Sequence, residues 1–256
     1  MTVKLFVLGC SGSGKSTAAH HVVKHAQDKG YSAIHVNDYE ILYKMFQADK
    51  EPKGGKFRPT AYYGFDVIDL TVYDKALMQL EQAVLLSSSQ ANDFIILEFA
   101  RDDYSKALSL FSKGFLKDAY FLFLDSDPDT CISRIHSRVI HRTTIDDHFV
   151  PEHIIRAFNK SNKHYLASGL KTDYSVMDER VKIIDNSYTS LDFFKVEVTK
   201  FAESIFQRER YISSETEQLP RISATTPADK TNKKARLLQD TEPIQIVAPV
   251  DDSVES

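Results

Sequence analysis

The chain has 256 residues, of which 42% are hydrophobic and 27% charged, and its formal net charge is −4 at pH 7. Such a chain can bury a sizeable core as one α/β domain with or without a tail, and its mildly acidic balance argues against sequence-independent binding of nucleic acid. Its apolar runs are only strand-sized, residues 1–10 lack signal-peptide features, and its two cysteines make neither a disulfide framework nor a metal site, so we expect a cytoplasmic protein without a membrane span.

Strand and helix patterns alternate along residues 1–212, which predicts an α/β fold with a doubly wound, mostly parallel five-stranded sheet and helices on both faces. The predicted strands are Val3–Leu8, Ser32–Asn37, Asp93–Phe99, Tyr120–Asp125 and Val181–Asp185. The predicted helices are Lys15–Asp28, Tyr39–Gln47, Thr71–Leu86, Tyr104–Phe111, Asp129–His141, Pro151–Tyr165 and Leu191–Arg210.

Residues 213–256 differ from the rest of the chain in composition. They contain no Phe, Tyr, Trp, Gly or Cys, and their eight acidic and five basic residues leave a net charge of −3. A segment so poor in large apolar groups cannot offset the entropy lost on ordering. We therefore predict a domain over 1–212 and a disordered tail, in which Pro243–Pro249 is a candidate docking motif for a partner protein.

A glycine-rich loop lies between the first predicted strand and the first predicted helix. Its sequence, Gly9-Cys10-Ser11-Gly12-Ser13-Gly14-Lys15-Ser16, matches the phosphate-binding P-loop pattern G-x-x-x-x-G-K-[ST]. In such a loop the backbone N–H groups and the helix N-terminus bind phosphate oxygens, the lysine reaches the β- and γ-phosphates, and the last hydroxyl binds Mg²⁺. The residues predicted to bind ATP are Gly9, Ser11, Gly12, Ser13, Gly14, Lys15, Ser16 and Thr17.

A P-loop enzyme also needs a carboxylate that helps to hold Mg²⁺ at the end of a neighbouring buried strand. Four apolar residues precede Glu98, which makes Ser16 and Glu98 the predicted metal ligands. The alternative is that Glu98 only caps the following turn. Asp125 follows a similar strand, but it leads into Asp127-Pro128, a sequence that suits a helix start better.

Three arginines recur at intervals of four residues, so Arg134, Arg138 and Arg142 lie on one face of a helix. Phosphoryl transfer depends on cations that converge on the phosphates. We therefore predict catalytic roles for Arg134 and Arg138 in a helical lid over about 134–156. The alternative is a solvated basic face that pairs with nearby acids such as Asp129.

The acceptor side is predicted where the second strand ends. Ligands of doubly wound sheets lie beyond the carboxyl ends of the strands, and a kinase of hydroxyl groups needs a carboxylate there. Asp38 is the first candidate and Glu40 the second, although Asn37-Asp38 could simply cap the next helix. Within the acceptor-side segment 38–66, basic and aromatic residues at Lys50–Tyr63 could form an acceptor-binding flap or an ordinary surface loop.

The order of the P-loop, Ile96–Arg101, Leu124–Pro128 and Arg134–Arg138 resembles the nucleoside and nucleotide kinases of the adenylate-kinase-like P-loop group. The resemblance implies that Arg101, three residues after the strand-end acid, holds the acceptor. It also implies that the two later arginines belong to a mobile lid. Phe99-Ala100 replaces the Gly-Pro of the adenylate kinase acceptor motif, so the resemblance does not identify the acceptor.

Together these features predict an ATP- and Mg²⁺-dependent phosphotransferase acting on a small acceptor, a nucleoside, nucleotide or related metabolite. One alternative is a P-loop ATPase or nucleotide switch without an acceptor, which recruits a partner through its tail. Another is a polynucleotide or nucleotide-sugar kinase. The histidines at His20, His21 and His25 are expected to have surface or packing roles.

Overall fold

The computed structural model describes residues 2–49, 55–60, 64–88, 93–141, 147–158 and 162–218. Met1–Thr216 forms one compact unit, and Glu217–Ser256 falls into a second. From residue 219 onward, the predicted tail lies outside the described residues. Within the described ranges, we find no helix with both the length and the apolar character needed to cross a membrane.

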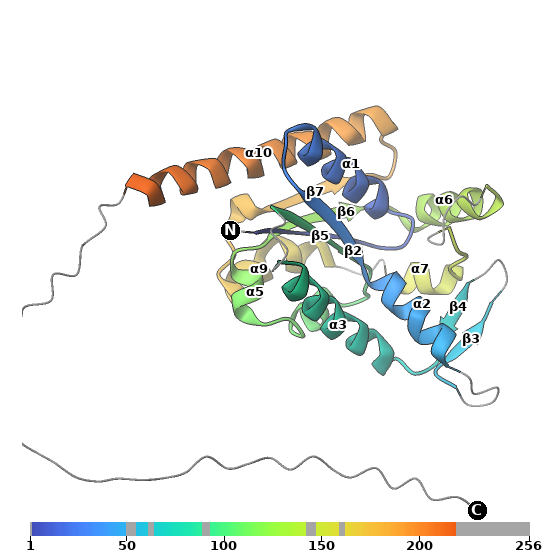
Figure 1. Ribbon diagram of the computed structural model, residues 1–256. Helices are drawn as coiled ribbons and strands as arrows, with labels where there is room; N and C mark the ends of the chain where they lie inside the picture. Colours follow the sequence, from blue (N-terminus) through green and yellow to red (C-terminus); the bar gives the residue numbers. More distant parts are fainter. Residues whose placement is uncertain are drawn as a thin grey trace, which may run out of the picture. The chain divides into compact units, whose positions relative to one another are not determined.

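Five parallel strands form a sheet in the middle of the first unit (Figure 1). In chain order they are β1 (Val3–Gly9), β2 (Ala33–Asn37), β5 (Phe94–Phe99), β6 (Tyr120–Asp125) and β7 (Val181–Asp185). Their order across the sheet is β2-β5-β1-β6-β7, and every neighbouring pair is parallel. The strands and their parallel arrangement agree with the sequence prediction, which did not extend to their order.

Helices cover both faces of the sheet, which confirms the doubly wound arrangement (Figure 1). One face packs against α1 (Lys15–Asp28) and α10 (Leu191–Gln218). The other packs against α3 (Thr71–Ser88), α4 (Tyr104–Leu108), α5 (Lys113–Lys117) and α9 (Leu170–Tyr174). A strand covered on both sides needs apolar residues at successive positions, and all six residues of β5 are buried.

Strand β1 contributes to both cores because successive side chains of a strand point to opposite faces. Leu5 and Val7 belong to the core with α1 and α10, whereas Phe6 and Leu8 belong to the other. The Phe6 ring is fully buried and stacks on Phe121 at a centroid distance of 5.1 Å. Its edge-on ring contacts are Phe99, Phe111 and Phe115.

Further elements lie at the carboxyl edge of the sheet. They are α2 (Asp38–Ala48), β3 (Phe57–Pro59), β4 (Phe65–Val67), α6 (Pro128–Ile140) and α7 (Glu152–Phe158). The antiparallel pair of β3 and β4 was not predicted, because strands of three residues are too short to show an alternating pattern. Phe57 and Phe65 pack together there and against Phe46 of α2.

The helix predicted over Pro151–Tyr165 is described only in part, because residues 159–161 lie outside the described residues. Its described parts are α7 and α8 (Asn162–His164), and α8 leads into a π-helix over Tyr165–Gly169 that was not predicted. A Cβ on Gly169 would lie 2.2 Å from the Tyr165 ring, so the ring lies directly over the glycine backbone. The wider turn of a π-helix departs from the 3.6-residue period by which a helix is predicted.

Two other helix ends differ from the prediction. The segment predicted as one helix over Tyr104–Phe111 forms α4 up to Leu108, and α5 follows from Lys113. Helix α10 continues to Gln218 instead of ending at Arg210. It continues because the sequence offers neither a glycine nor a proline between Arg210 and Pro220 to interrupt the backbone hydrogen bonds.

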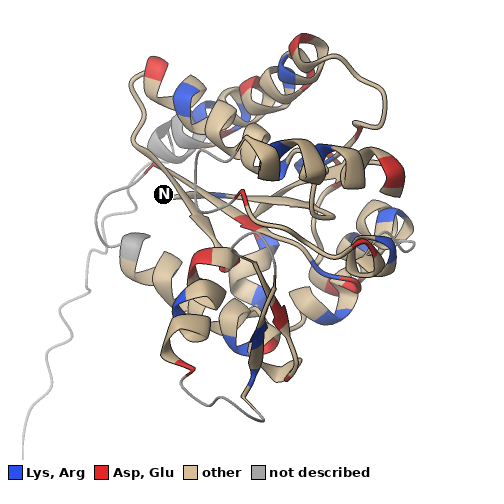
Figure 2. Cartoon of the chain, turned by 90° about the vertical axis from the view of Figure 1, so that its right-hand side faces the viewer, with Lys and Arg blue, Asp and Glu red and all other residues tan. Residues whose placement is uncertain are grey.

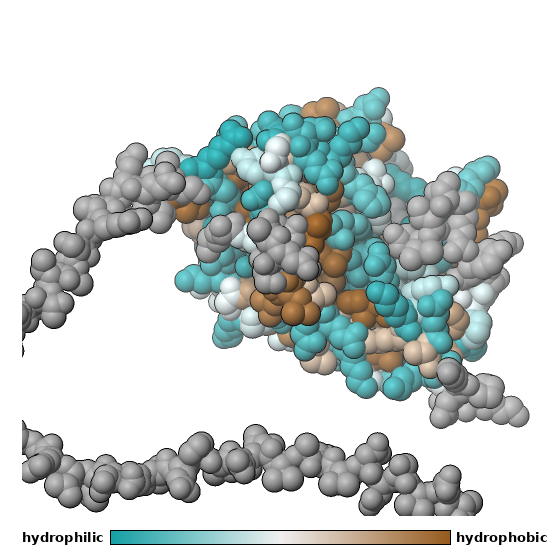
Figure 3. All heavy atoms as spheres, in the orientation of Figure 1, coloured by the Kyte–Doolittle hydropathy of each residue, from teal (hydrophilic) through white to brown (hydrophobic). Residues whose placement is uncertain are grey.

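Some apolar side chains stay exposed along α3. Met78, Leu85 and Leu86 have exposed fractions of 45%, 57% and 72%, and brown atoms lie over this helix in Figure 3. They contact the solvent instead of the strands, so truncating them removes little buried surface. Substitutions of these exposed side chains therefore serve as controls for substitutions in the core.

We predict that Phe6→Ala lowers the free energy of unfolding by about 3–5 kcal/mol, because it removes a buried ring and leaves a cavity between aromatic neighbours. The exposed control Leu86→Ala should change it by less than about 0.5 kcal/mol. Urea unfolding followed by circular dichroism measures both. Equal effects of the two substitutions would contradict the placement of Phe6 in the core.

Candidate functional site

A cavity of about 520 Å³ lies at the carboxyl edge of the sheet. Its walls come from the P-loop, the start of α2, the loop after β5, helix α6 and residues 147–158. Figure 2 looks at this edge, where acidic and basic residues lie close together. The carboxyl ends of parallel strands are where α/β folds bind their ligands, so this cavity is the candidate active site.

The P-loop has the tight backbone that its glycines predict. Gly12 and Gly14 have φ angles of 86° and 100°, a region that side chains with a Cβ disfavour. A Cβ would lie 2.5 Å from the Cys131 carbonyl oxygen at Gly12 and 2.8 Å from Asn186 Nδ2 at Gly14. The loop is therefore held against its neighbours by direct backbone packing.

Six of the predicted nucleotide-binding residues line the cavity, and two do not. Those that line it are Ser11, Gly12, Gly14, Lys15, Ser16 and Thr17. Gly9 and Ser13 are buried behind the loop. Their part is in the loop's own geometry, since the Ser13 N–H donates to the Cys10 carbonyl over 3.2 Å.

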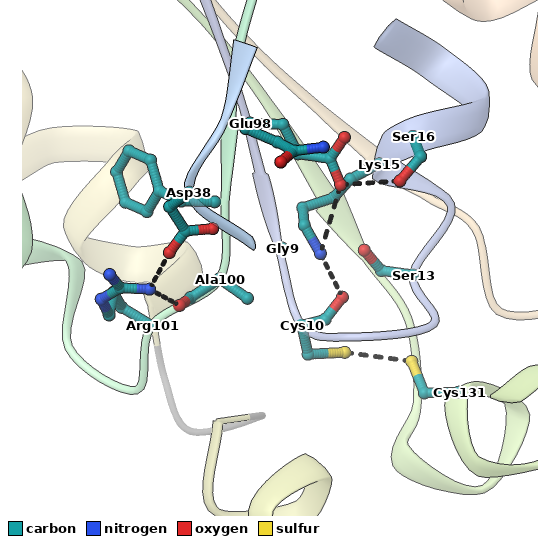
Figure 4. Close-up of polar contacts among 12 residues, drawn as sticks. Gly9, Cys10, Ser13, Lys15, Ser16, Asp38, Glu98, Ala100, Arg101 and Cys131 are labelled. Carbon is teal, nitrogen blue, oxygen red and sulfur yellow. Dashed lines mark hydrogen bonds and ion pairs between the residues drawn. The ribbon is translucent and has the colours of Figure 1, made fainter. Parts of the chain in front are cut away.

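The structure brings Lys15, Ser16 and Glu98 together (Figure 4). The Ser16 hydroxyl donates to Glu98 Oε1 over 2.8 Å, and Lys15 Nζ lies 4.0 Å from the same oxygen. Lys15 Nζ also donates to the carbonyl oxygen of Cys10 over 3.0 Å. A hydroxyl and a carboxylate are the hard oxygen ligands that Mg²⁺ prefers, so these residues fit that ion.

Mg²⁺ would take its remaining ligands from water and from the nucleotide phosphates. Among the described residues no group of three or more His, Cys, Asp or Glu side chains could hold a metal ion. Mg²⁺ is commonly bound by one or two protein groups together with substrate phosphates and water. The pair of Ser16 and Glu98 is consistent with that mode.

The Glu98 carboxylate is buried, and the pKa of this group nevertheless lies below its usual value of 4.5. Burial alone would raise the pKa, but the His35 imidazole, the Lys15 ammonium and the Ser16 hydroxyl together outweigh burial. His35 Nε2 lies 2.9 Å from Glu98 Oε2. The carboxylate is therefore ionised at neutral pH and available to a cation.

Sequence reasoning missed His35, which comes from β2 at the edge of the sheet. It meets Glu98 because β2 is the neighbour of β5, with Asn37 opposite Glu98 in the register. His20 also lines the cavity, and its ring lies 5.1 Å from that of His35. The other two histidines of α1 contact α10 instead, at Thr199 and Glu203.

Asp38 and Arg101 form a buried ion pair on the other side of the cavity (Figure 4). Arg101 Nη1 donates to Asp38 Oδ2 over 2.5 Å and to the Ala100 carbonyl over 2.6 Å, and Nη2 donates to the Tyr73 carbonyl over 3.0 Å. Both side chains are less than a tenth exposed. Burial raises the pKa of Asp38 more than Arg101 lowers it, so Asp38 is a stronger base than an exposed aspartate.

The neighbouring residues Asn37 and Asp38 have separate tasks. The Asn37 side chain caps α2, because its Oδ1 accepts the Glu40 N–H over 2.9 Å. Asp38 is therefore not needed as the cap, and it lines the cavity. Glu40, the second candidate, is exposed and does not line it.

Arg134 and Arg138 both line the cavity from α6. Arg134 donates to the Gly12 carbonyl over 3.4 Å and to the Asn186 carbonyl over 2.8 Å. Arg138 donates to the His148 carbonyl over 3.4 Å. Arg142 and the rest of 142–146 lie outside the described residues.

The acids named as alternative partners of these arginines have other contacts. Asp127 caps α6, as the Asp-Pro signal predicts, and accepts the Thr130 N–H over 2.8 Å. Asp129 pairs with Arg156 over 2.7 Å on the surface. The contacts described for these two acids are therefore with residues other than Arg134 and Arg138.

Aromatic residues line the half of the cavity that lies beside Asp38 and Arg101. The rings of Tyr39 and His148 are parallel with centroids 3.9 Å apart, and Phe65 stacks on Tyr39 at 5.7 Å. The described part of the predicted flap does not line the cavity: Phe57 is buried beneath it, and Arg58 pairs with Asp66 over 2.8 Å. Residues 50–54 and 61–63 of the flap lie outside the described residues.

Two further residues brace the P-loop and were missed by sequence reasoning. The buried Tyr104 hydroxyl accepts the Gly9 N–H over 2.7 Å, and its own proton faces the carbonyls of Gly9 and Phe99 at 3.1 and 3.3 Å. Burial raises the pKa of this phenol. Asn186, which follows β7, donates to the Ser13 carbonyl over 2.8 Å. Nothing local in the sequence marks either residue.

The five-stranded parallel sheet, the glycine-rich loop after β1 and the helix that follows it have the arrangement of a P-loop α/β fold. The sequence matches no protein-family model, and no curated protein matches it either. Fold similarity is found with P-loop kinases. A gluconokinase from Sinorhizobium meliloti 1021 is 15% identical with a TM-score of 0.44, over 82% of this chain and 97% of that one.

Two further solved structures of kinases are similar to this chain, again at low sequence identity. The APS kinase of Mycobacterium tuberculosis, in complex with AMPPNP and APS, is 17% identical over 79% of this chain and 98% of that one, with a TM-score of 0.48. A sugar kinase from Janibacter sp. HTCC2649 is 16% identical over 79% and 95%, with a TM-score of 0.46. Likeness at this level carries no argument about this chain, so its activity has to be argued from the site.

We predict that Tyr104→Phe weakens both the fold and nucleotide binding. It leaves the buried Gly9 N–H without its acceptor, which should lower the free energy of unfolding by about 1–3 kcal/mol. Urea unfolding and titration with a fluorescent ATP analogue measure the two effects. Tyr188→Phe, at a side chain that is 91% exposed, is the control and should change neither.

We predict that Glu98 contributes stability that is lost in acid. Because its pKa in the folded protein lies below the usual 4.5, the contribution is complete above about pH 4.5 and disappears as the pH falls through the folded value. The difference in unfolding free energy between the wild type and Glu98→Gln should therefore stay nearly constant from about pH 7 to about pH 5 and shrink as the pH falls below about 4.5. A difference that stays constant or grows in acid would contradict the ionised state assigned to Glu98.

Proposed function

We propose that the chain is an ATP- and Mg²⁺-dependent phosphotransferase that acts on a small acceptor with a hydroxyl group. The observation that carries the proposal is that one cavity joins the P-loop residues Lys15 and Ser16 to the buried Asp38–Arg101 pair. Its volume of about 520 Å³ suits a small-molecule site. A protein that only hydrolyses ATP has no need of a buried carboxylate–guanidinium pair on the far side of that cavity.

On the donor side, the P-loop backbone and Lys15 would hold the phosphates of ATP. Lys15 would exchange its hydrogen bond with the Cys10 carbonyl for contacts to the β- and γ-phosphates. Ser16 and the ionised Glu98 would hold Mg²⁺, which supplies charge neutralisation at the phosphates. His35 would keep the Glu98 carboxylate in position.

On the acceptor side, Asp38 would orient the hydroxyl and take its proton. Arg101 holds one carboxylate oxygen, Oδ2, and in Figure 4 the second oxygen points away from Arg101 toward the P-loop. We propose that this second oxygen, Oδ1, takes the proton of the acceptor hydroxyl. The raised pKa of Asp38 favours this role, because a base is most effective when its pKa is closer to the working pH.

Arg134 and Arg138 would stabilise the charge that develops on the transferred group. The Arg134 guanidinium already lies beside the loop, at 3.4 Å from the Gly12 carbonyl. Cations fixed at the place where charge develops contribute strongly to phosphoryl transfer. For this role, both side chains would have to give up their contacts with backbone carbonyls when ATP binds. We expect such a change for residues of a mobile lid, which we place at about 134–156 within the domain 1–212.

The acceptor we propose is a nucleoside, a nucleotide or a related metabolite. The aromatic side chains of Tyr39, Phe65 and Tyr73 line the acceptor half, and flat rings of this kind favour stacking with a planar base. The described cations of the predicted flap do not line the cavity. Among the described residues, the flap therefore adds no cation to the cavity that could hold the backbone of a polynucleotide.

The test measures the release of ADP from Mg-ATP by the purified protein. Pools of nucleosides, nucleotides, sugars and cofactor precursors are added in turn as candidate acceptors. We expect one pool to raise turnover well above the rate without acceptor, and Lys15→Ala to abolish it. Asp38→Asn should lower kcat by about 10²–10⁴-fold while ATP still binds. Asp28→Asn, at an exposed position, is the matched control and should leave turnover unchanged.

Two outcomes would contradict the proposal. ATP hydrolysis that no pool stimulates would remove the acceptor, and with it the roles of Asp38 and Arg101. Full acceptor-dependent activity in Asp38→Asn would leave the phosphotransferase intact but remove its proposed base.

A further inference from the structure

The two cysteines of the chain are in contact, although they are far apart in sequence. Cys10 belongs to the P-loop and Cys131 to the first turns of α6, and they lie 121 positions apart. Their sulfur atoms lie 3.0 Å apart, and no disulfide joins them (Figure 4). They pack in an apolar cluster with Ile132, Ile135 and Val150. The proposed phosphotransfer uses neither thiol.

We propose that Cys10 and Cys131 form an oxidative modification site, at which a hydroperoxide such as hydrogen peroxide converts the two thiols into a disulfide that weakens nucleotide binding. A disulfide bond is about 2.0 Å long, so the sulfur atoms need to approach by only about 1 Å. Because the chain has only two cysteines, an intramolecular disulfide can form only between them.

The chemistry balances with one equivalent of peroxide. The Cys10 thiolate attacks one peroxide oxygen, the O–O bond breaks, and Cys10 sulfenic acid and one water form once the thiol proton reaches the leaving hydroxide. The Cys131 sulfur then attacks the Cys10 sulfur and displaces the hydroxyl, which leaves as a second water with the Cys131 proton. Two thiols are oxidised by two electrons, and hydrogen peroxide is reduced to two waters.

Access assigns the first step to Cys10. Cys131 is fully buried, whereas Cys10 keeps 5% of its surface exposed, which suits a small oxidant. The hydrogen bond with Cys10 and burial raise the pKa of the Cys131 thiol. Cys131 is therefore the partner that resolves the sulfenic acid at short range.

The site matters for nucleotide binding because both sulfurs are attached to the phosphate loop or to the backbone that packs against it. The Cys10 carbonyl accepts hydrogen bonds from Lys15 Nζ and from the Ser13 N–H. A Cβ on Gly12 would lie 2.5 Å from the Cys131 carbonyl, so the loop and the start of α6 leave no spare room. A shift of about 1 Å at either cysteine therefore displaces the backbone N–H groups of the P-loop, which the proposed function assigns to phosphate binding.

The experiment treats the full chain with hydrogen peroxide and measures intact mass, thiol content after denaturation, and affinity for a fluorescent ATP analogue. We expect a loss of two hydrogens, loss of both thiols, and affinity weakened by roughly 10- to 100-fold. A thiol reductant should restore all three. Cys131→Ser and Cys131→Ala should bind the analogue like the reduced wild type and keep that affinity after peroxide; the alanine variant covers the case in which a buried hydroxyl impairs folding.

Several results would overturn the inference. They are an unchanged mass with both thiols retained, a disulfide between two chains on a non-reducing gel, unchanged affinity after the disulfide has formed, and equal peroxide sensitivity in the Cys131 variants. The mass and thiol readouts need no catalysis. A protein that forms the disulfide but transfers no phosphate would refute the proposed function and leave this inference standing.

Discussion

The buried carboxylate of Glu98 is the interaction on which the site depends. A buried charge is costly unless other groups compensate for it, and here Lys15 and Ser16 of α1 and His35 of β2 do so. These groups come from two separate parts of the chain, so the same charge joins α1, β2 and β5 at one point. The candidate metal ligand is therefore positioned by groups of the P-loop and of the neighbouring strand β2.

The acceptor half is built around a second buried charge. Arg101 satisfies Asp38 and two backbone carbonyls, and its guanidinium lies 4.8 Å from the centre of the Tyr73 ring. Because Asn37 caps α2, Asp38 can keep its carboxylate in the cavity. The two halves are thus joined rigidly by β5, which carries Glu98 at its end and Arg101 just beyond it.

The P-loop is held from both sides by polar groups that the apolar cores bring into place. Tyr104 of α4 reaches Gly9 from one face of the sheet, and Asn186 reaches Ser13 from the end of β7. Neither residue belongs to a motif, and each acts on the loop through backbone groups of a single residue, Gly9 or Ser13. Mutations at such positions alter a binding site through its geometry, which is why a motif search underestimates the number of residues that a site needs.

The sequence by itself determined the five strands, the P-loop with its following helix, the Asp127 cap and the type of residue required at each end of the cavity. Apolar runs, glycines and caps act within a few residues, so they are readable locally. The short β3–β4 pair and the π-helix escaped because their patterns are too brief or have another period. Only the tertiary structure decided the pairs Ser16–Glu98, Asp38–Arg101 and Cys10–Cys131, which lie 82, 63 and 121 positions apart. Strand order and register create these contacts, and no local pattern in the chain records which strands become neighbours.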